Sequence, residues 1–132
     1  MHAKRFNLKH ESYSLNNLIK DIFMNPLDLN PRFSDKVLFS IIEQSAVFVC
    51  ACPAQVCSQL RSQRELYNYQ MDCLNKTETD TLVHETIAKA LIKTHADLES
   101  CLEKILHLEG WDMTTYQMPE NIQKRILKSI IP

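Results

Sequence analysis

Apolar residues recur at intervals of three and four along almost the whole chain, which is the period of an α-helix. Prolines and polar clusters interrupt this spacing and divide the chain into five segments. The spacing predicts helices over residues 12–24, 34–52, 53–75 and 79–109, and a short one from Pro119 onward. No internal repeat or low-complexity segment is present. The pattern therefore indicates an all-α fold.

The first predicted helix, residues 12–24, has one apolar face and one polar face. The apolar face consists of Leu15, Leu18, Ile19, Ile22 and Phe23. Ser12 or Ser14 is available as its N-cap. Two prolines within residues 25–32 disfavour helix at the residue before each of them, so we expect the helix to end there.

The second predicted helix starts at Ser34, a good N-cap, with Asp35 in its first turn, where the helix dipole favours negative charge. From Ala46 to Cys52 every residue is apolar, so we expect these turns to be buried on all sides. Pro53 has no amide hydrogen and suits the first position of a helix. The sequence thus predicts a boundary or sharp kink at Cys52, with Cys52 as N-cap of the next helix.

The third predicted helix carries a packing seam with one charged member, Arg64. The seam consists of Pro53, Cys57, Leu60, Arg64, Tyr67, Met71 and Leu74. A buried arginine requires a partner, and Glu43, Glu85 or Glu99 would supply one. We expect instead that the Arg64 stem packs in the seam while its guanidinium reaches the surface.

The fourth predicted helix, residues 79–109, is the longest, and Gly110 follows it as a C-cap glycine. Its heptad seam is predicted to be His84, Ile87, Leu91, Thr94, Leu98, Cys101, Ile105 and Leu108. A flanking row is predicted to widen the buried stripe: Ala88, Ile92, His95, Glu99, Leu102 and Leu106. We expect His95 and Glu99, four residues apart, to form a hydrogen-bonded pair at the edge of the seam.

These elements predict a single helical domain over residues 1–132, with residues 1–11 as a flexible N-terminal tail. Its architecture is expected to be an elongated antiparallel helical bundle, similar to a four-helix bundle with about five helices. Helices of about 20 to 30 residues span about 30 to 45 Å, which is long for a chain of this size. Either the bundle is elongated or a second chain completes it.

Composition excludes several functional classes. The chain has a single glycine, whereas phosphate-binding loops, dinucleotide fingerprints and nucleophile elbows need glycine at fixed positions. The formal net charge of -1 gives no general attraction to nucleic acid, and we predict no nucleic-acid partner. The aromatic residues of two sequence stretches are expected to pack in the core or anchor loops: Tyr67, Tyr69, Trp111 and Tyr116.

The sequence favours a cytoplasmic protein. Its first ten residues are basic, but no apolar stretch of signal-peptide length follows them. The longest apolar run, residues 46–54, is far shorter than the roughly 20 residues that span a bilayer, so no membrane span is predicted. In that compartment the five cysteines are expected to be reduced.

Three of the cysteines lie within eight residues and are candidate metal ligands: Cys50, Cys52 and Cys57. In one continuous helix Cys50 and Cys57 would stand about 10 Å apart, so a shared metal requires a turn at Cys52. Thiolates at such a turn suit copper or zinc. The spacing matches no strong zinc pattern, and buried cysteines after an apolar run favour a role in the core.

His84 and His95 are the candidate histidine ligands for the same metal. They lie about 16 Å apart on one helix, so they share a metal only through another helix. The stretch HETIA, residues 84–88, begins like a zinc-binding HExxH helix but has Ala88 in place of the second histidine. A phosphoryl-accepting role for His84 is an alternative that its seam position disfavours.

No catalytic sequence motif stands out. A catalytic triad assembled in space would not require one, because its members need not be close in sequence. The leading hypothesis is a non-catalytic helical-bundle protein that acts by dimerisation or by binding a protein partner. Its basis is the apolar segment 46–52 together with helices too long for a compact monomer. The alternative hypothesis is a thiol-dependent bundle that binds copper or zinc, or senses oxidation, through the cysteine cluster.

Overall fold

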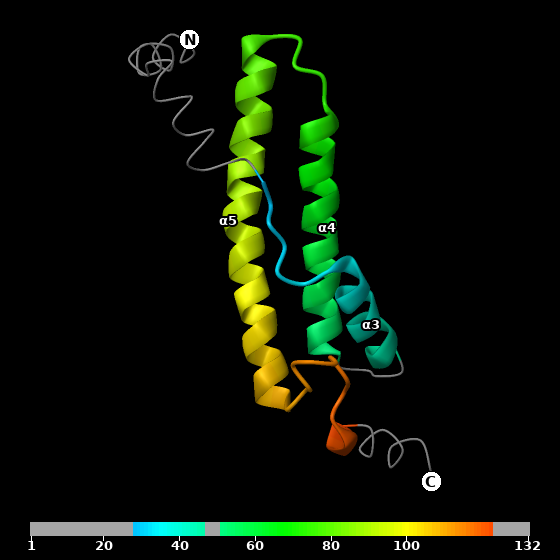
Figure 1. Ribbon diagram of the computed structural model, residues 1–132. Coiled ribbons are helices and arrows are strands. Elements are labelled where there is room, and N and C mark those ends of the chain that lie inside the picture. The colour runs from blue at the N-terminus through cyan, green and yellow to red at the C-terminus, as the bar shows by residue number, and fades with distance from the viewer. Residues whose placement is uncertain (1–27, 47–50, 123–132) are drawn as a thin grey trace.

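A computed structural model describes residues 28–46 and 51–122. Their regular structure is helical throughout, without a strand, which confirms the all-α prediction for this part of the chain (Figure 1). The predicted helix 12–24, the tail 1–11 and Cys50 lie outside the described residues. The helices are α3 (Asp35–Ser45), α4 (Cys52–Asp72) and α5 (Glu78–Glu109), and a further helical turn begins at residue 120.

Helix α3 begins as predicted but ends earlier than predicted. The Ser34 side chain accepts a hydrogen bond from the amide of Val37, and Asp35 lies in the first turn. The helix ends at Ser45 with Ala46 as its C-cap, so it does not continue to Cys52. Ala46 and Cys52 are exposed, so the expected burial of segment 46–52 is wrong at both of its ends. The reason is tertiary: α4 packs back against α3, so the chain has to reverse between them.

Helix α4 starts one residue earlier than predicted, because Ala51 is its N-cap and Cys52 is its first residue. Its buried face agrees with the predicted seam from Pro53 to Tyr67 and then ends at Gln70, which is 6% exposed, whereas the predicted Met71 and Leu74 are 44% and 76% exposed. The seam therefore continues past the point where other described residues cover it.

Helix α5 has well-defined ends. The side chains and backbone of Thr77 and Asp80 form a reciprocal capping box at its start. Gly110 ends it with φ of 81°, a left-handed conformation that costs glycine little, and the Trp111 amide donates to the Leu106 carbonyl. The predicted C-cap is confirmed.

The buried face of α5 is the predicted flanking row rather than the centre of the heptad seam. Its buried residues are Ala88, Leu91, His95, Glu99, Leu102 and Leu106, whereas Cys101 and Leu108 are exposed. The face is rotated because α5 packs against two neighbours. One is α4, and the other is the 28–34 segment, whose Arg32 bonds to Glu99 and Ser100.

The two long helices run antiparallel, and α3 lies beside one half of α4 (Figure 1). The 28–34 segment crosses the α4–α5 pair before it enters α3 (Figure 1). The main core lies at the α3 end and consists of Phe33, Leu38, Ile41, Cys57, Leu60, Leu102, Leu106, Trp111 and Met118. A second, smaller cluster of Tyr67, Ala88 and Leu91 lies farther along the hairpin, with Leu29 packed against it.

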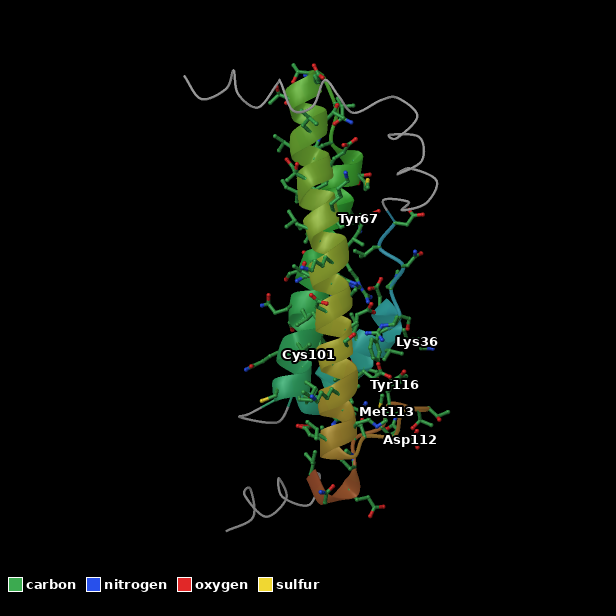
Figure 2. The ribbon with its side chains drawn as sticks, turned by 90° about the vertical axis from the view of Figure 1, so that its left-hand side faces the viewer. Lys36, Tyr67, Cys101, Asp112, Met113 and Tyr116 are labelled. Carbon is green, nitrogen blue, oxygen red and sulfur yellow. The ribbon has the colours of Figure 1, made fainter. Side chains whose placement is uncertain are left out.

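The loop after α5 is held against α3 by one side chain. Gln44 donates to the carbonyl of Tyr116 and accepts from the amide of Met118. Figure 2 shows Met113 and Tyr116 on the side of α5 where Lys36 of α3 lies. Asp112 accepts from the amides of Thr114 and Thr115, and these hydrogen bonds lower the pKa of its carboxyl. The predicted loop-anchoring role of Tyr116 is consistent with its partly buried position beside the core.

Within the described ranges, no helix combines the length and the apolar content needed to cross a bilayer.

Leu102 should be a main determinant of stability, because its side chain is fully buried in the main core. We expect Leu102→Ala to lower the free energy of unfolding by about 2–5 kcal/mol, as buried leucine truncations do. Urea denaturation followed by circular dichroism measures this change. Leu82→Ala, at a side chain that is 41% exposed, is the control and should cost clearly less; equal losses would contradict the placement of the core.

Candidate functional site

Arg64 lies at the centre of a buried polar network, only 8% exposed. Its Nε donates to His95 Nε2 at 3.0 Å, its Nη1 to Asp35 Oδ1 at 2.7 Å, and its Nη2 to the Phe33 carbonyl at 2.6 Å. The expectation that its guanidinium reaches the surface is wrong. The 28–34 segment and the start of α3 supply acceptors for the guanidinium, so it is satisfied where it lies.

Glu99 is the second charged member of the network and is 1% exposed. Its Oε2 accepts from the backbone amides of Arg32 at 2.7 Å and Phe33 at 2.9 Å, and lies 3.5 Å from Arg64 Nη2. Of the three glutamates proposed as partners of Arg64, Glu99 is therefore the one that makes this contact. One carboxylate thus neutralises a buried guanidinium and satisfies two buried N–H groups at once.

Arg32 closes the network on the surface side. Its side chain is 48% exposed and bonds to Glu103 at 3.1 Å and to the Ser100 hydroxyl at 2.8 Å. The 28–34 segment is therefore fastened to α5 by both its backbone and its side chain. Sequence reasoning did not single out Arg32, because nothing in its local pattern indicates long-range pairing.

His95 is fully buried, and its neighbours determine its protonation. Arginine has no hydrogen-bond acceptor, so Arg64 Nε must donate and His95 Nε2 must carry a lone pair. The proton of the neutral ring is then on Nδ1, which lies 3.4 Å from Glu99 Oε1 without a hydrogen bond among the described residues. Burial lowers the pKa of His95, and the charges of Arg64 and Arg32 act in the same direction, against Glu99.

This network positions chain segments. Its main donors and acceptors are already hydrogen-bonded or ion-paired within the protein. The Arg64 donors bond to protein acceptors, the Glu99 carboxylate is shared by two amides and Arg64, and the lone pair of His95 Nε2 is occupied. His95 and Glu99 line neither the groove beside Phe39 and Arg61 nor the groove beside Cys52 and Leu98. The arrangement therefore fixes where the 28–34 segment and α3 lie against the hairpin.

The predicted metal ligands occupy different environments. Cys57 is fully buried in the main core, and burial raises the pKa of its thiol to about 12, against the opposing charge of Arg64. Cys52 is exposed at the start of α4, and Cys50 lies outside the described residues. A thiol with so high a pKa is protonated at neutral pH and is a poor metal ligand.

The two histidines are each engaged with a neighbour. His84 Nδ1 contacts Asn75 Oδ1 at 2.6 Å, and His95 accepts from Arg64. In the part of the chain that the structure describes, no group of three or more His, Cys, Asp or Glu side chains is arranged to hold a metal ion. Copper or zinc binding stays a hypothesis, which elemental analysis of the untagged protein would test.

One side of the α4–α5 hairpin has a stretch without charged residues, bordered on α5 by Asp80 and Asp97, and we call this stretch the uncharged face. Gln63 of α4 contacts Thr94 of α5 on this side. The helical spacing from these two residues places the following residues around them: Gln55, Gln59, Ser62, Leu66, Tyr69 and Cys73 on α4, and Val83, Ile87, Ala90, Thr94, Leu98, Cys101, Ile105 and Leu108 on α5. Several of its apolar side chains are strongly exposed, among them Leu66, Tyr69, Val83 and Leu108.

Removing the Glu99 carboxylate should be strongly destabilising. We expect Glu99→Ala to lower the free energy of unfolding by about 3–5 kcal/mol, because it leaves the buried Arg64 without this partner and two amides without an acceptor. Glu103→Ala is the matched control, since this carboxylate binds the same Arg32 at the surface, and it should cost less than about 1 kcal/mol. Urea denaturation measures both, and similar effects would contradict the role given to Glu99.

Stability should fall in mildly acidic solution because of His95. Its pKa is lower in the folded protein than the ordinary value of 6.5, so below about pH 6.5 the unfolded chain binds more protons than the folded one. The His95 contribution should be complete above that pH and lost as the pH falls toward the folded pKa. Denaturation between pH 5 and pH 8 should show a steeper loss for the wild type than for His95→Gln. Leu82→Ala, which removes no titratable group, should keep the wild-type slope, and a His95→Gln slope equal to wild type would contradict the assignment.

Comparisons with known proteins were made at the level of family, sequence and structure. No family model, no curated protein and no solved structure matches this chain. The contacts, burial and charges of the described residues are therefore the basis for the function proposed below.

Proposed function

We propose that this protein is a non-catalytic helical module that acts by pairing with a second copy of itself through the uncharged face. The observation that carries the proposal is the scarcity of charge on this side of the hairpin together with its exposed apolar side chains. Leu66, Tyr69 and Val83 are 45%, 67% and 49% exposed. Depletion of charge and enrichment of tyrosine and aliphatic groups are the features that distinguish the core of a protein interface from the remaining surface.

Helix α4 supports this proposal because two rows of largely apolar residues run along it. The first, from Pro53 to Tyr67, is buried against the rest of the fold. The second, in which Leu66, Tyr69 and Cys73 follow at intervals of three and four, faces away from it. A helix with a second row of this kind has a surface available for a further neighbour.

Helix α5 supplies the matching half of the face. Its 32 residues include ten charged ones, of which Asp80 and Asp97 border the uncharged face and none lies among the eight residues that α5 contributes to it. The charged side chains on α5 are instead distributed over its other sides, where Glu99 and Glu103 bind Arg32. A helix of this length presents a strip of about 48 Å, long enough for the roughly 1,200 Å² that a stable interface buries in total.

A second copy is the partner that fits this face best. A closed twofold pair is the commonest assembly of soluble proteins and joins the same surface of both chains. In such a pair residue i of one copy contacts residue j of the other and residue j contacts residue i, so a face with few charges limits repulsion between like charges. The opposite side of the hairpin is covered by the 28–34 segment, whereas no other segment within residues 28–46 and 51–122 covers the uncharged face.

Light scattering coupled to size exclusion tests the proposal. At micromolar concentration the intact chain should have about twice the 15.4 kDa mass of one chain. Leu66→Asp should give the mass of a single chain at the same concentration, because it places a carboxylate inside the interface of each copy.

Phe39→Asp is the matched control for this experiment. Phe39 is 50% exposed, similar to Leu66, but lies on α3, away from the uncharged face. It should leave the dimeric mass unchanged, and circular dichroism should show that both variants keep their helices. A monomeric wild type would overturn the proposal, and so would a Leu66→Asp variant that remains dimeric.

A further inference from the structure

The buried seam of α4 continues beyond the last layer that the described residues cover. Tyr67 is buried in the smaller core cluster, but Met71 and Leu74, which follow it at intervals of four and three, are 44% and 76% exposed. On α5 the corresponding residues before Ala88 are Thr81 and His84, and both are partly exposed. We call these four residues, Met71, Leu74, Thr81 and His84, the end surface.

The 28–34 segment shows which part of the chain runs toward the end surface. Phe33 lies at the level of Arg64 and Glu99, whereas Leu29 packs at the level of Tyr67 and Ala88. Going backward along the chain from Phe33 to Leu29 is therefore a movement along the hairpin toward its turn, and Figure 1 shows this direction. The described part of this segment therefore leads toward the end surface as the chain is followed back to residue 28.

The sequence before this point has the pattern of a helix that needs a surface. Its apolar residues fall on one side of the predicted helix 12–24, and Ile19, Ile22 and Phe23 belong to the part nearest the 28–34 segment. Residues 25–27 span at most about 10 Å, and Leu74 lies about 10 Å along α4 from Tyr67. The end of the predicted helix is thus within reach of the end surface.

Charge favours the same placement. The turn of the hairpin and its flanks, residues 72–85, contain four acidic side chains and one lysine. The first ten residues of the chain contain three lysine or arginine side chains and no acidic one. A chain that places residues 12–24 on the end surface brings this basic stretch toward the acidic turn.

We propose that the end surface is a docking site for the chain's own residues 12–24, with Ile19, Ile22 and Phe23 packed on Met71 and Leu74. The contact is intramolecular and lies on the side of the hairpin that the 28–34 segment covers, separate from the uncharged face. In this proposal the α4–α5 core gains one layer. The predicted helix 12–24 takes the place there that the 28–34 segment has nearer to α3.

Hydrogen exchange of the intact chain, followed by mass spectrometry, tests this docking. Backbone amides of residues 15–24 should exchange at least tenfold more slowly than in the same chain in denaturant, and equally so when the protein is diluted. Leu74→Asp should abolish this protection while that of residues 99–106 persists. Leu108→Asp is the control, because Leu108 is also 76% exposed but lies at the far end of α5, and it should leave residues 15–24 protected.

A substitution on the other side of the proposed contact supplies a second measurement. Ile22→Asp should raise the rate at which peroxide oxidises Met71, because the thioether loses its cover. Unprotected amides at residues 15–24 in the intact chain would overturn the proposal, as would protection that survives Leu74→Asp. Protection lost on dilution, or lost in Leu108→Asp, would assign the end surface to a second copy instead.

Discussion

The burial of Arg64 is the constraint on which the arrangement of the other elements depends. A guanidinium inside a protein needs acceptors in the plane of its donors, and no single helix provides them. Here they come from three places: His95 and Glu99 on α5, the Phe33 carbonyl, and Asp35 at the start of α3. Helix α3, helix α5 and the segment between residues 28 and 34 are thus held in one geometry around α4.

The same network explains the order of the layers along the hairpin. Glu99 binds the backbone of Arg32 and Phe33, which places Phe33 in the main core and directs Leu29 toward Tyr67 and Ala88. The 28–34 segment therefore takes the place of a neighbouring helix over this side of the hairpin. The opposite side has no such cover among the described residues, and there both helices carry few charges.

Several features followed from the sequence because they depend on local chemistry. The N-cap at Ser34 and the C-cap at Gly110 were predictable, since each needs only one suitable residue beside a helical pattern. The buried row from Pro53 to Tyr67 was predictable from its spacing. The end of α3 at Ser45 was not, because the apolar run after it suits a buried helix as well as a chain reversal.

The candidate site shows the same division. The sequence by itself determined that residues 28–46 and 51–122 are mainly helical, that Arg64 lies in a seam and that Glu99 is one of few carboxylates able to reach it. Only the tertiary structure decided that Arg64 is buried, that His95 is its acceptor and that the buried face of α5 is the flanking row. The physical reason is that a helical pattern specifies which residues share a face. Which face is buried, and whether its charged residues find partners, depends on segments distant in sequence, here Arg32 to Asp35.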